Sequence, residues 1–210
     1  MTILTRRNLV FGGLAGTSAT VLGATFVPPA KQSQAQVLTV EDVLFDPDNP
    51  VLGNPDGDVT IVEFFDYQCP YCKANHPDLL DVVAEDKNIR LVMKDWPIFG
   101  APSVRATQLA LGAADTGDYK VANKALMETQ GRLSEQDIEA ALIAADLEVS
   151  KLDSAYRADR DKWDGLMSRN SSQAAQLRLQ GTPAFIIGTT IYAGSMDRAA
   201  LLEAVANSRD

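Results

Sequence analysis

The apolar positions in the first half of the chain predict a strand, a helix and a second strand. Residues 59–65 are mostly apolar, which is typical of a central strand covered on both faces. Residues 73–85 follow with helical spacing, and Pro77 inside them predicts a kink. Residues 89–95 form the second predicted strand, in which apolar residues alternate with basic ones: Leu91 and Met93 with Arg90 and Lys94. A unit of this length favours parallel pairing of its two strands.

A long helical segment follows. From residue 103 to about residue 179 the pattern is helical and rich in alanine, which predicts three to five helices. Ser134 and Asp137 offer a capping box for one of them. The apolar stripe of that helix comprises Ile138, Leu142, Ile143 and Leu147. A later stripe comprises Leu152, Tyr156, Trp163, Leu166, Met167, Ala174 and Leu177. We assign both stripes to the core rather than to a cofactor site.

The C-terminal end returns to strand patterns. Pro183 ends the helical segment, because proline cannot continue a helix. Residues 184–187 and 189–192 predict two short strands, and Gly188 between them indicates a hairpin. Residues 195–198 open a last helix, whose expected inward residues are Leu201, Leu202 and Val205.

Residues 36–58 form a lead-in to the first strand. Thr39 and Asp42 offer a capping box for a short helix, with Val40, Val43 and Leu44 as one apolar face. Residues 46–50 contain two prolines and end this helix, and residues 53–58 are turn-forming. The lead-in could pack on the domain or pair with another subunit, and the sequence leaves both open.

The first 35 residues have a different composition. They contain Arg6, Arg7 and Lys31 and no acidic residue, and residues 9–27 are apolar or small. This pattern, with a small-x-small site ending at Ala35, predicts a secretory signal peptide cleaved after that residue. Residues 5–10 also resemble a twin-arginine export signal. The alternative is an uncleaved membrane anchor, although the glycines in the segment make it a poor span.

Composition and charge narrow the class of protein. A length of 210 residues with 46% hydrophobic and 22% charged residues suits one globular domain, with or without an insertion. The net charge of -9, with no cluster of Lys and Arg, argues against nucleic acid as a partner. Without residues 1–35, 16 basic residues (19 minus 3) face 28 acidic ones, a charge of -12. An exported protein with one close cysteine pair resides where disulfides persist.

The run Cys69-Pro70-Tyr71-Cys72 holds the only two cysteines of the chain, between the first strand and the first helix. Pro70 suits the first helical position, so we expect Cys69 at the N-cap and Cys72 one turn later, within disulfide reach. Free N–H groups and the helix dipole favour a thiolate, so the pKa of Cys69 should lie below about 8.5. Cys69 is then the nucleophile of a redox pair. Cys72, expected to be more buried, resolves the mixed disulfide.

Other functions of the cysteine pair are weaker. Structural zinc usually needs four ligands, and His76 is the only histidine that could join Cys69 and Cys72. A purely structural disulfide would close a very short loop and would therefore stabilise little. A soft Cu(I) site in a metal-handling protein is a further alternative, but no Met-rich or His-rich tract supports it. We expect neither a metal nor an organic cofactor.

Glu63 is the next candidate, because it lies in a buried strand six residues before Cys69. A buried carboxyl near the sulfurs could accept the proton of Cys72. Equally, Glu63 could form an ion pair with Lys94 on the neighbouring strand. His76 lies one turn beyond Cys72, where a histidine is more often a surface or partly packed residue than a catalytic one.

Two stretches together resemble the thioredoxin superfamily: residues 64–72, which end in the cysteine pair, and residues 181–188, with the sequence Gly-Thr-Pro-Ala-Phe-Ile-Ile-Gly. Within it, the chain resembles the DsbA family of periplasmic thiol–disulfide oxidoreductases, and its lead-in is most similar to the ScsC-like branch. The resemblance covers residues 37–208. It implies an α/β thioredoxin fold with an inserted all-helical subdomain. With the signal peptide 1–35 and the lead-in 36–58 inferred above, the chain then divides into a first part of the fold 59–100, a helical insertion 101–180 and a second part 181–210.

The resemblance also implies roles for single residues. Local sequence gives the cis form to only about one X–Pro bond in twenty, but the resemblance implies a cis Thr182–Pro183 bond that faces Cys69. It implies backbone pairing of substrate at Thr182 and supports Glu63 as a buried acid. The residues expected to contact substrate are Thr182, Pro183, Pro70 and Tyr71. Tyr71 replaces the His of DsbA proper and Thr182 replaces its Val, as in isomerase or reductase members.

The sequence thus predicts a periplasmic thiol–disulfide oxidoreductase that forms or rearranges disulfides in other exported, cysteine-containing proteins. An unidentified redox partner must reset the cysteine pair. The alternatives are a disulfide isomerase or reductase that acts as an oligomer through residues 36–58 and, less favoured, a periplasmic Cu(I)-handling protein.

Overall fold

The computed structural model describes residues 37–209, so the predicted signal peptide lies outside the described residues. One mixed sheet has the strand order β1-β3-β2-β4-β5. The strands are β1 (Val51–Gly53), β2 (Val59–Phe65), β3 (Ile89–Asp95), β4 (Ala184–Ile187) and β5 (Thr190–Ala193). Strands β2 and β3 pair in parallel, as predicted, and the other three pairs are antiparallel.

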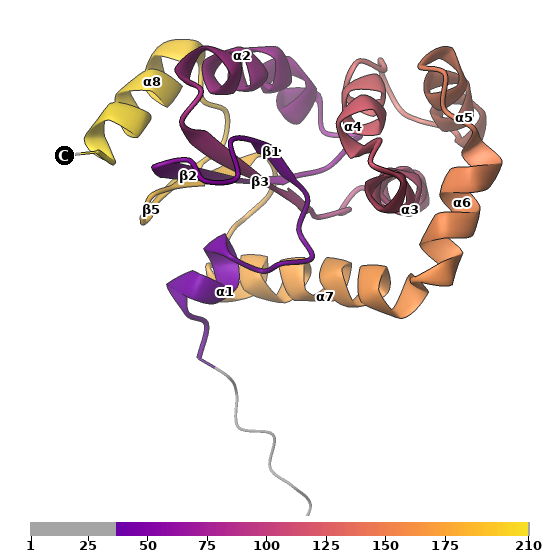
Figure 1. Ribbon diagram of the computed structural model, residues 1–210, viewed down its shortest axis with the longest axis horizontal. Coiled ribbons are helices and arrows are strands. Elements are labelled where there is room, and N and C mark those ends of the chain that lie inside the picture. Colours follow the sequence, from indigo (N-terminus) through magenta and orange to yellow (C-terminus); the bar gives the residue numbers. More distant parts are fainter. Residues whose placement is uncertain (1–36, 210) are drawn as a thin grey trace, which may run out of the picture. The chain divides into compact units, whose positions relative to one another are not determined.

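Helices cover both faces of the sheet and extend beyond it. They are α1 (Val40–Leu44), α2 (Pro70–Asp86), α3 (Ala101–Thr116), α4 (Tyr119–Met127), α5 (Glu135–Ala144), α6 (Val149–Ala158), α7 (Arg160–Gln176) and α8 (Arg198–Asn207). Figure 1 shows α2 and α8 over one face, α1 and α7 over the other, and α3 to α6 beside the sheet. Five helices lie between β3 and β4, within the predicted number. Within residues 37–209, no helix combines the length and apolar character that a membrane span requires.

Strand β2 contributes to two separate cores, because successive side chains of a strand point to opposite faces. Ile61 and Phe65 belong to the larger core, which includes residues of α2 and α8. Val62 and Phe64 belong to a smaller core with residues of α1 and α7. All four side chains are fully buried, which confirms the prediction of a central strand. Helix α7, the last helix of the predicted insertion, covers the sheet face that carries the smaller core. It therefore packs on the sheet rather than apart from it.

Several local expectations were wrong. Residues 51–53, taken in part as turn, form β1 and pair with the outer side of β3. Helix α2 was expected to contain Pro77, and it does, running from Pro70 to Asp86. Three predicted inward residues are instead exposed: Val40, Ile143 and Leu202. When a helix has only a few apolar residues, the sequence does not show which of them a neighbouring element will cover.

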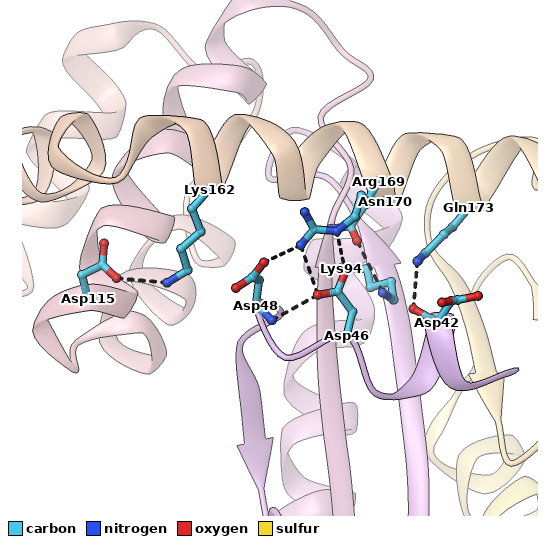
Figure 2. Close-up of polar contacts among 9 residues, drawn as sticks. All are labelled: Asp42, Asp46, Asp48, Lys94, Asp115, Lys162, Arg169, Asn170 and Gln173. Carbon is cyan, nitrogen blue, oxygen red and sulfur yellow. Dashed lines mark hydrogen bonds and ion pairs between the residues drawn. The ribbon is translucent and has the colours of Figure 1, made fainter. Parts of the chain in front are cut away.

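Lys94 departs most from its expected surroundings. Its side chain points to the face opposite Leu91 and Met93, as the alternation predicts, but that face is also covered and Lys94 is fully buried. Its Nζ lies 3.4 Å from Oδ1 of Asn170 on α7 (Figure 2), in the smaller core. Burial lowers the pKa of Lys94 to about 8. Lys94 is therefore an internal polar group, and its presence does not show that this face of the strand is exposed to solvent.

Polar contacts attach the lead-in to α7 (Figure 2). Arg169 donates from Nε to Asp46 at 2.8 Å and from Nη2 to Asp48 at 2.6 Å. Gln173 donates to the backbone carbonyl of Asp42 at 2.8 Å. The sequence left open whether the lead-in packs on the domain or pairs with another subunit. Its described residues pack on the domain.

Asp46→Ala is expected to lower the free energy of unfolding by about 1–2 kcal/mol, because Arg169 loses its buried carboxylate partner. Burial by itself would raise the pKa of Asp46, but the Arg169 hydrogen bonds lower it below its ordinary value. This stabilisation is therefore present above the unfolded pKa and is lost as pH falls through the folded value. Urea titrations at pH 7 test the loss. Asp48→Ala is the control, because Asp48 is more exposed and should cost less.

Candidate active site

The cysteine pair lies at the start of α2, directly after β2. Cys69 is the N-cap and Pro70 occupies the first turn, as predicted. The backbone N–H of Cys72 donates to Sγ of Cys69 at 3.4 Å, and the Cys69 thiol donates to the carbonyl of Thr182 at 3.2 Å. Both cysteines are free thiols with 1% or less exposure, so the expected difference in their burial is slight. Tyr71 between them is 65% exposed.

The two thiols differ strongly in acidity. A hydrogen bond from the Cys72 thiol lowers the pKa of Cys69 to about 6; burial opposes this effect, and the N–H groups of Tyr71 and Cys72 add to it. Burial is the main cause that raises the pKa of Cys72 well above its ordinary value, and nearby Glu63 adds to that rise. At pH 7 the pair is therefore a thiolate next to a thiol, which agrees with the predicted division into nucleophile and resolving cysteine.

The acidity of Cys69 is expected to depend on the hydrogen-bond donor at position 72. Cys72→Ala removes the thiol that contributes most to the lowered pKa, so the thiolate of Cys69 should form at a higher pH. Cys72→Ser keeps a donor of similar length, so its midpoint should stay nearer to the wild-type value. Ultraviolet absorbance of the thiolate between pH 4 and 10 measures both midpoints. Equal midpoints in the two variants would contradict this explanation.

Glu63 is fully buried on the same sheet face as the cysteines, and neither of its carboxylate oxygens has a hydrogen-bond partner in the described chain. Burial raises its pKa to about 8, and the charges of Cys69 and Asp95 add to the rise. The expected alternative, an ion pair with Lys94, is wrong. Glu63 lies opposite Met93 in the strand register, and Lys94 points to the other face.

The Thr182–Pro183 peptide bond is cis, as the resemblance implied. Ala184, the next residue, pairs antiparallel with Phe64, so the loop before β4 meets the end of β2. This pairing explains why two segments more than a hundred residues apart form one site. The substrate contacts expected at Thr182, Pro183, Pro70 and Tyr71 stay predictions.

Asp66 holds the loop that carries the cysteines, a role that we did not predict. It is 1% exposed and accepts hydrogen bonds from the N–H groups of Gln68 and Ile98, both at 2.7 Å. It also accepts from the N–H of Phe99 and the hydroxyl of Ser103. An aspartate directly after a buried strand is a turn signal that could have identified it. It positions the motif against residues 98–103.

A groove of about 820 Å³ borders the motif, between α2 and the end of α4. Its lining includes Pro70, His76, Phe99 and Met127. His76 is 3% exposed, neither ring nitrogen has a hydrogen-bond partner in the described residues, and burial lowers its pKa to about 4. His76 is thus buried, and not at the surface or partly packed as expected, and no hydrogen bond within residues 37–209 connects it to a cysteine. Over the same residues, no three His, Cys, Asp or Glu side chains gather into a metal-binding group.

Comparison with protein families and solved structures gives consistent matches. A family model described as thioredoxin matches residues 46–207. A thioredoxin-like oxidoreductase from Silicibacter pomeroyi DSS-3 is 34% identical, with a TM-score of 0.77 over 82% of this chain and 98% of that chain. The thiol-disulfide exchange protein alpha-DsbA2 from Wolbachia pipientis is 27% identical, with a TM-score of 0.74 over 80% and 90%. The catalytic domain of Proteus mirabilis ScsC is 27% identical, with a TM-score of 0.70 over 80% and 93%.

Curated relatives were also found, but this chain covers a smaller part of their length than it does of the solved structures above. The Na(+)/H(+) antiporter NhaA 1 of Salinispora arenicola is 28% identical over 88% of this chain, but the match covers only 29% of the antiporter. Disulfide bond formation protein D of Bacillus subtilis is 49% identical over 37 residues, 18% of this chain and 17% of that protein. This chain thus spans less than a third of the antiporters that it matches, and their transport activity does not follow from the match.

Proposed function

The chain belongs to the thioredoxin family, and from that premise we propose that it is a thiol–disulfide oxidoreductase acting on other exported proteins that contain cysteines. The observation that carries the proposal is the Cys69 thiol. Its pKa is lowered to about 6, and its Sγ lies at the N-terminus of α2, 3.2 Å from the carbonyl oxygen of Thr182. This arrangement supplies a nucleophilic thiolate at neutral pH beside a backbone edge.

The reaction runs through a mixed disulfide. In the oxidised pair, a client thiolate attacks Sγ of Cys69, and the Cys69–Cys72 bond breaks with its electron pair on Cys72. The Cys72 thiolate takes a proton from Glu63. A second client thiolate then attacks the client sulfur of the mixed disulfide and releases the Cys69 thiolate. Two electrons have passed from client to enzyme, and a separate redox partner reoxidises the pair.

The client segment is proposed to bind at the loop of the cis peptide bond. Ionisation of Cys69 frees the carbonyl of Thr182 to accept an N–H from an extended client chain, a form of strand addition. Exposed Tyr71 and Phe99 offer apolar contacts on the same side as the motif. Pro70 and Pro183 limit the flexibility of this surface. Such recognition depends on backbone and apolar contacts, so it suits clients of varied sequence.

Export to the periplasm is part of the proposal. The sequence pattern of residues 1–35 supports it, and one structure 27% identical to this chain is described as a periplasmic thioredoxin-like protein from Salmonella enterica serovar Typhimurium. Its TM-score is 0.74 over 83% of this chain.

Isomerase or reductase activity in an oligomer is the second candidate, favoured by Tyr71 and Thr182 in the positions that DsbA proper fills differently. Deletion of residues 36–58 is a poor test of oligomerisation, because it would remove β1 and the Asp46–Arg169 contacts. Native mass of the intact protein over a range of concentrations is the better test.

Two refolding assays test the proposed function. Oxidised protein should form disulfides in a reduced, unfolded client. If it is an isomerase, reduced protein should also recover activity from a client with scrambled disulfides. Failure in both assays, with a folded protein and intact cysteines, would contradict the proposal.

A further inference from the structure

A second buried acid shares the sheet face of Glu63. Strands β2 and β3 run in parallel register, with Glu63 opposite Met93 and Phe65 opposite Asp95. Side chains two apart on a strand point to the same face, so Asp95 lies one step farther along the face that carries Glu63. Both carboxyl groups are fully buried. Two acids are therefore enclosed behind the cysteine pair, and Lys94 between Met93 and Asp95 points to the other face.

Hydrogen bonds distinguish the two acids. The hydroxyl of Tyr119, on α4, donates to Oδ2 of Asp95 at 2.9 Å. The other oxygen of Asp95 has no partner within residues 37–209, and Glu63 has none on either oxygen. The carboxylate form is thus better stabilised at Asp95 than at Glu63, so a single proton should reside on Glu63.

Among the described residues, the other titratable groups that face this pair add no positive charge. Cys69 and Cys72 face Glu63 from α2. Asp66 and the phenols of Tyr67 and Tyr119 face Asp95. Burial is the main cause that raises the pKa of Asp95, to about 7, against about 8 for Glu63. Two carboxylates that are buried without a cation cannot both ionise cheaply.

We propose that Glu63 and Asp95 act as one carboxyl pair that shares a single proton near neutral pH, with Asp95 as the positioning residue that sets when Glu63 exchanges its proton with Cys72. This inference rests on the proposed function and adds a residue to it. While Asp95 is ionised, its charge keeps the shared proton on Glu63. When Cys72 leaves the disulfide as a thiolate, the proton moves from the Glu63 carboxyl to the Cys72 sulfur. In the reverse step, the Glu63 carboxylate takes that proton and Cys72 attacks Sγ of Cys69 in the mixed disulfide, which releases the client as a thiolate.

Asp95→Asn tests the proposal, because it removes the charge and keeps a hydrogen-bond acceptor for Tyr119. The titration of Glu63 is followed by carbon NMR of labelled glutamate carboxyl groups in the reduced protein, with Glu63→Gln to assign the signal. We expect the Glu63 midpoint to fall by about one pH unit. Tyr119→Phe should lower the Glu63 midpoint by less, because loss of the hydrogen bond makes Asp95 less acidic and so reduces its negative charge. In the Asp95→Asn background, Tyr119→Phe should have no further effect on that midpoint.

An unchanged Glu63 midpoint in folded Asp95→Asn would overturn the inference, since a merely structural Asp95 would alter stability without moving the titration. If Asp95→Asn does not fold, an unchanged midpoint in Tyr119→Phe overturns it instead. The titration does not depend on turnover. A protein that shows the shift but exchanges no disulfides would refute only the proposed function, whereas an active protein without the shift would refute only the carboxyl pair.

Discussion

Cys69→Ser is expected to reduce disulfide exchange with a client by about three orders of magnitude or more, to the uncatalysed rate. The N-terminus of α2 supplies two N–H groups to the atom at this position, but a serine hydroxyl does not ionise near neutral pH and cannot form a disulfide. The change replaces one buried atom, so the free energy of unfolding should change little. The measurement is the rate of client disulfide formation together with a urea titration.

Cys72→Ser is the matched control for this prediction. It should also stop turnover, but Cys69 should still attack a client disulfide once and remain joined to it, because no resolving thiol is present. Mass spectrometry should therefore detect a client adduct on Cys72→Ser and none on Cys69→Ser. An adduct on Cys72 in the Cys69→Ser protein would reverse the assigned roles.

Gly112→Ala is expected to lower the free energy of unfolding by about 1–3 kcal/mol. Gly112 lies on α3 where that helix crosses α6, and a Cβ atom there would meet the carbonyl oxygen of Leu152 at 2.1 Å. The obstacle is backbone, so the two helices would have to move apart. The higher helix propensity of alanine, about 1 kcal/mol, offsets only part of this cost. Urea titration measures the loss.

Gly165→Ala is the control, because Gly165 also lies inside a helix, α7. The nearest atom to its added Cβ is the end of the Arg169 side chain at 3.4 Å, an ordinary van der Waals distance, so Arg169 can keep its contacts with Asp46 and Asp48. We expect no loss, or a gain of up to about 1 kcal/mol from helix propensity. Equal destabilisation by both substitutions would show that the close approach of α3 and α6 is not what requires Gly112.

Patterns that depend on neighbouring residues predicted much of this structure. The apolar run of β2, the proline after Cys69 and the capping box at Ser134 each act over a few residues, and each is present as expected. The cis bond before Pro183 came from resemblance and not from local chemistry, and the structure confirms it. The roles assigned to the site residues stay predictions.

Features that depend on distant partners were not predictable. Lys94 alternates with apolar residues like a surface lysine, but it is fully buried and contacts Asn170, which lies 76 residues away in the sequence. Asp95 ends its strand as a turn residue would, yet it is fully buried and accepts a hydrogen bond from Tyr119 in the next segment. A single sequence gives no measure of such pairings, because the fold creates them.

The most direct test of the account is a redox titration of the Cys69–Cys72 pair, with Cys69→Ser and Cys72→Ser as controls. We expect a reversible two-electron disulfide in the wild-type protein and none in either variant. A potential near about -120 mV, the value of DsbA, would indicate a strong oxidant, and one near about -270 mV, the value of thioredoxin, would indicate a reductant. Failure of the wild-type pair to form a disulfide at any potential would contradict the central claim.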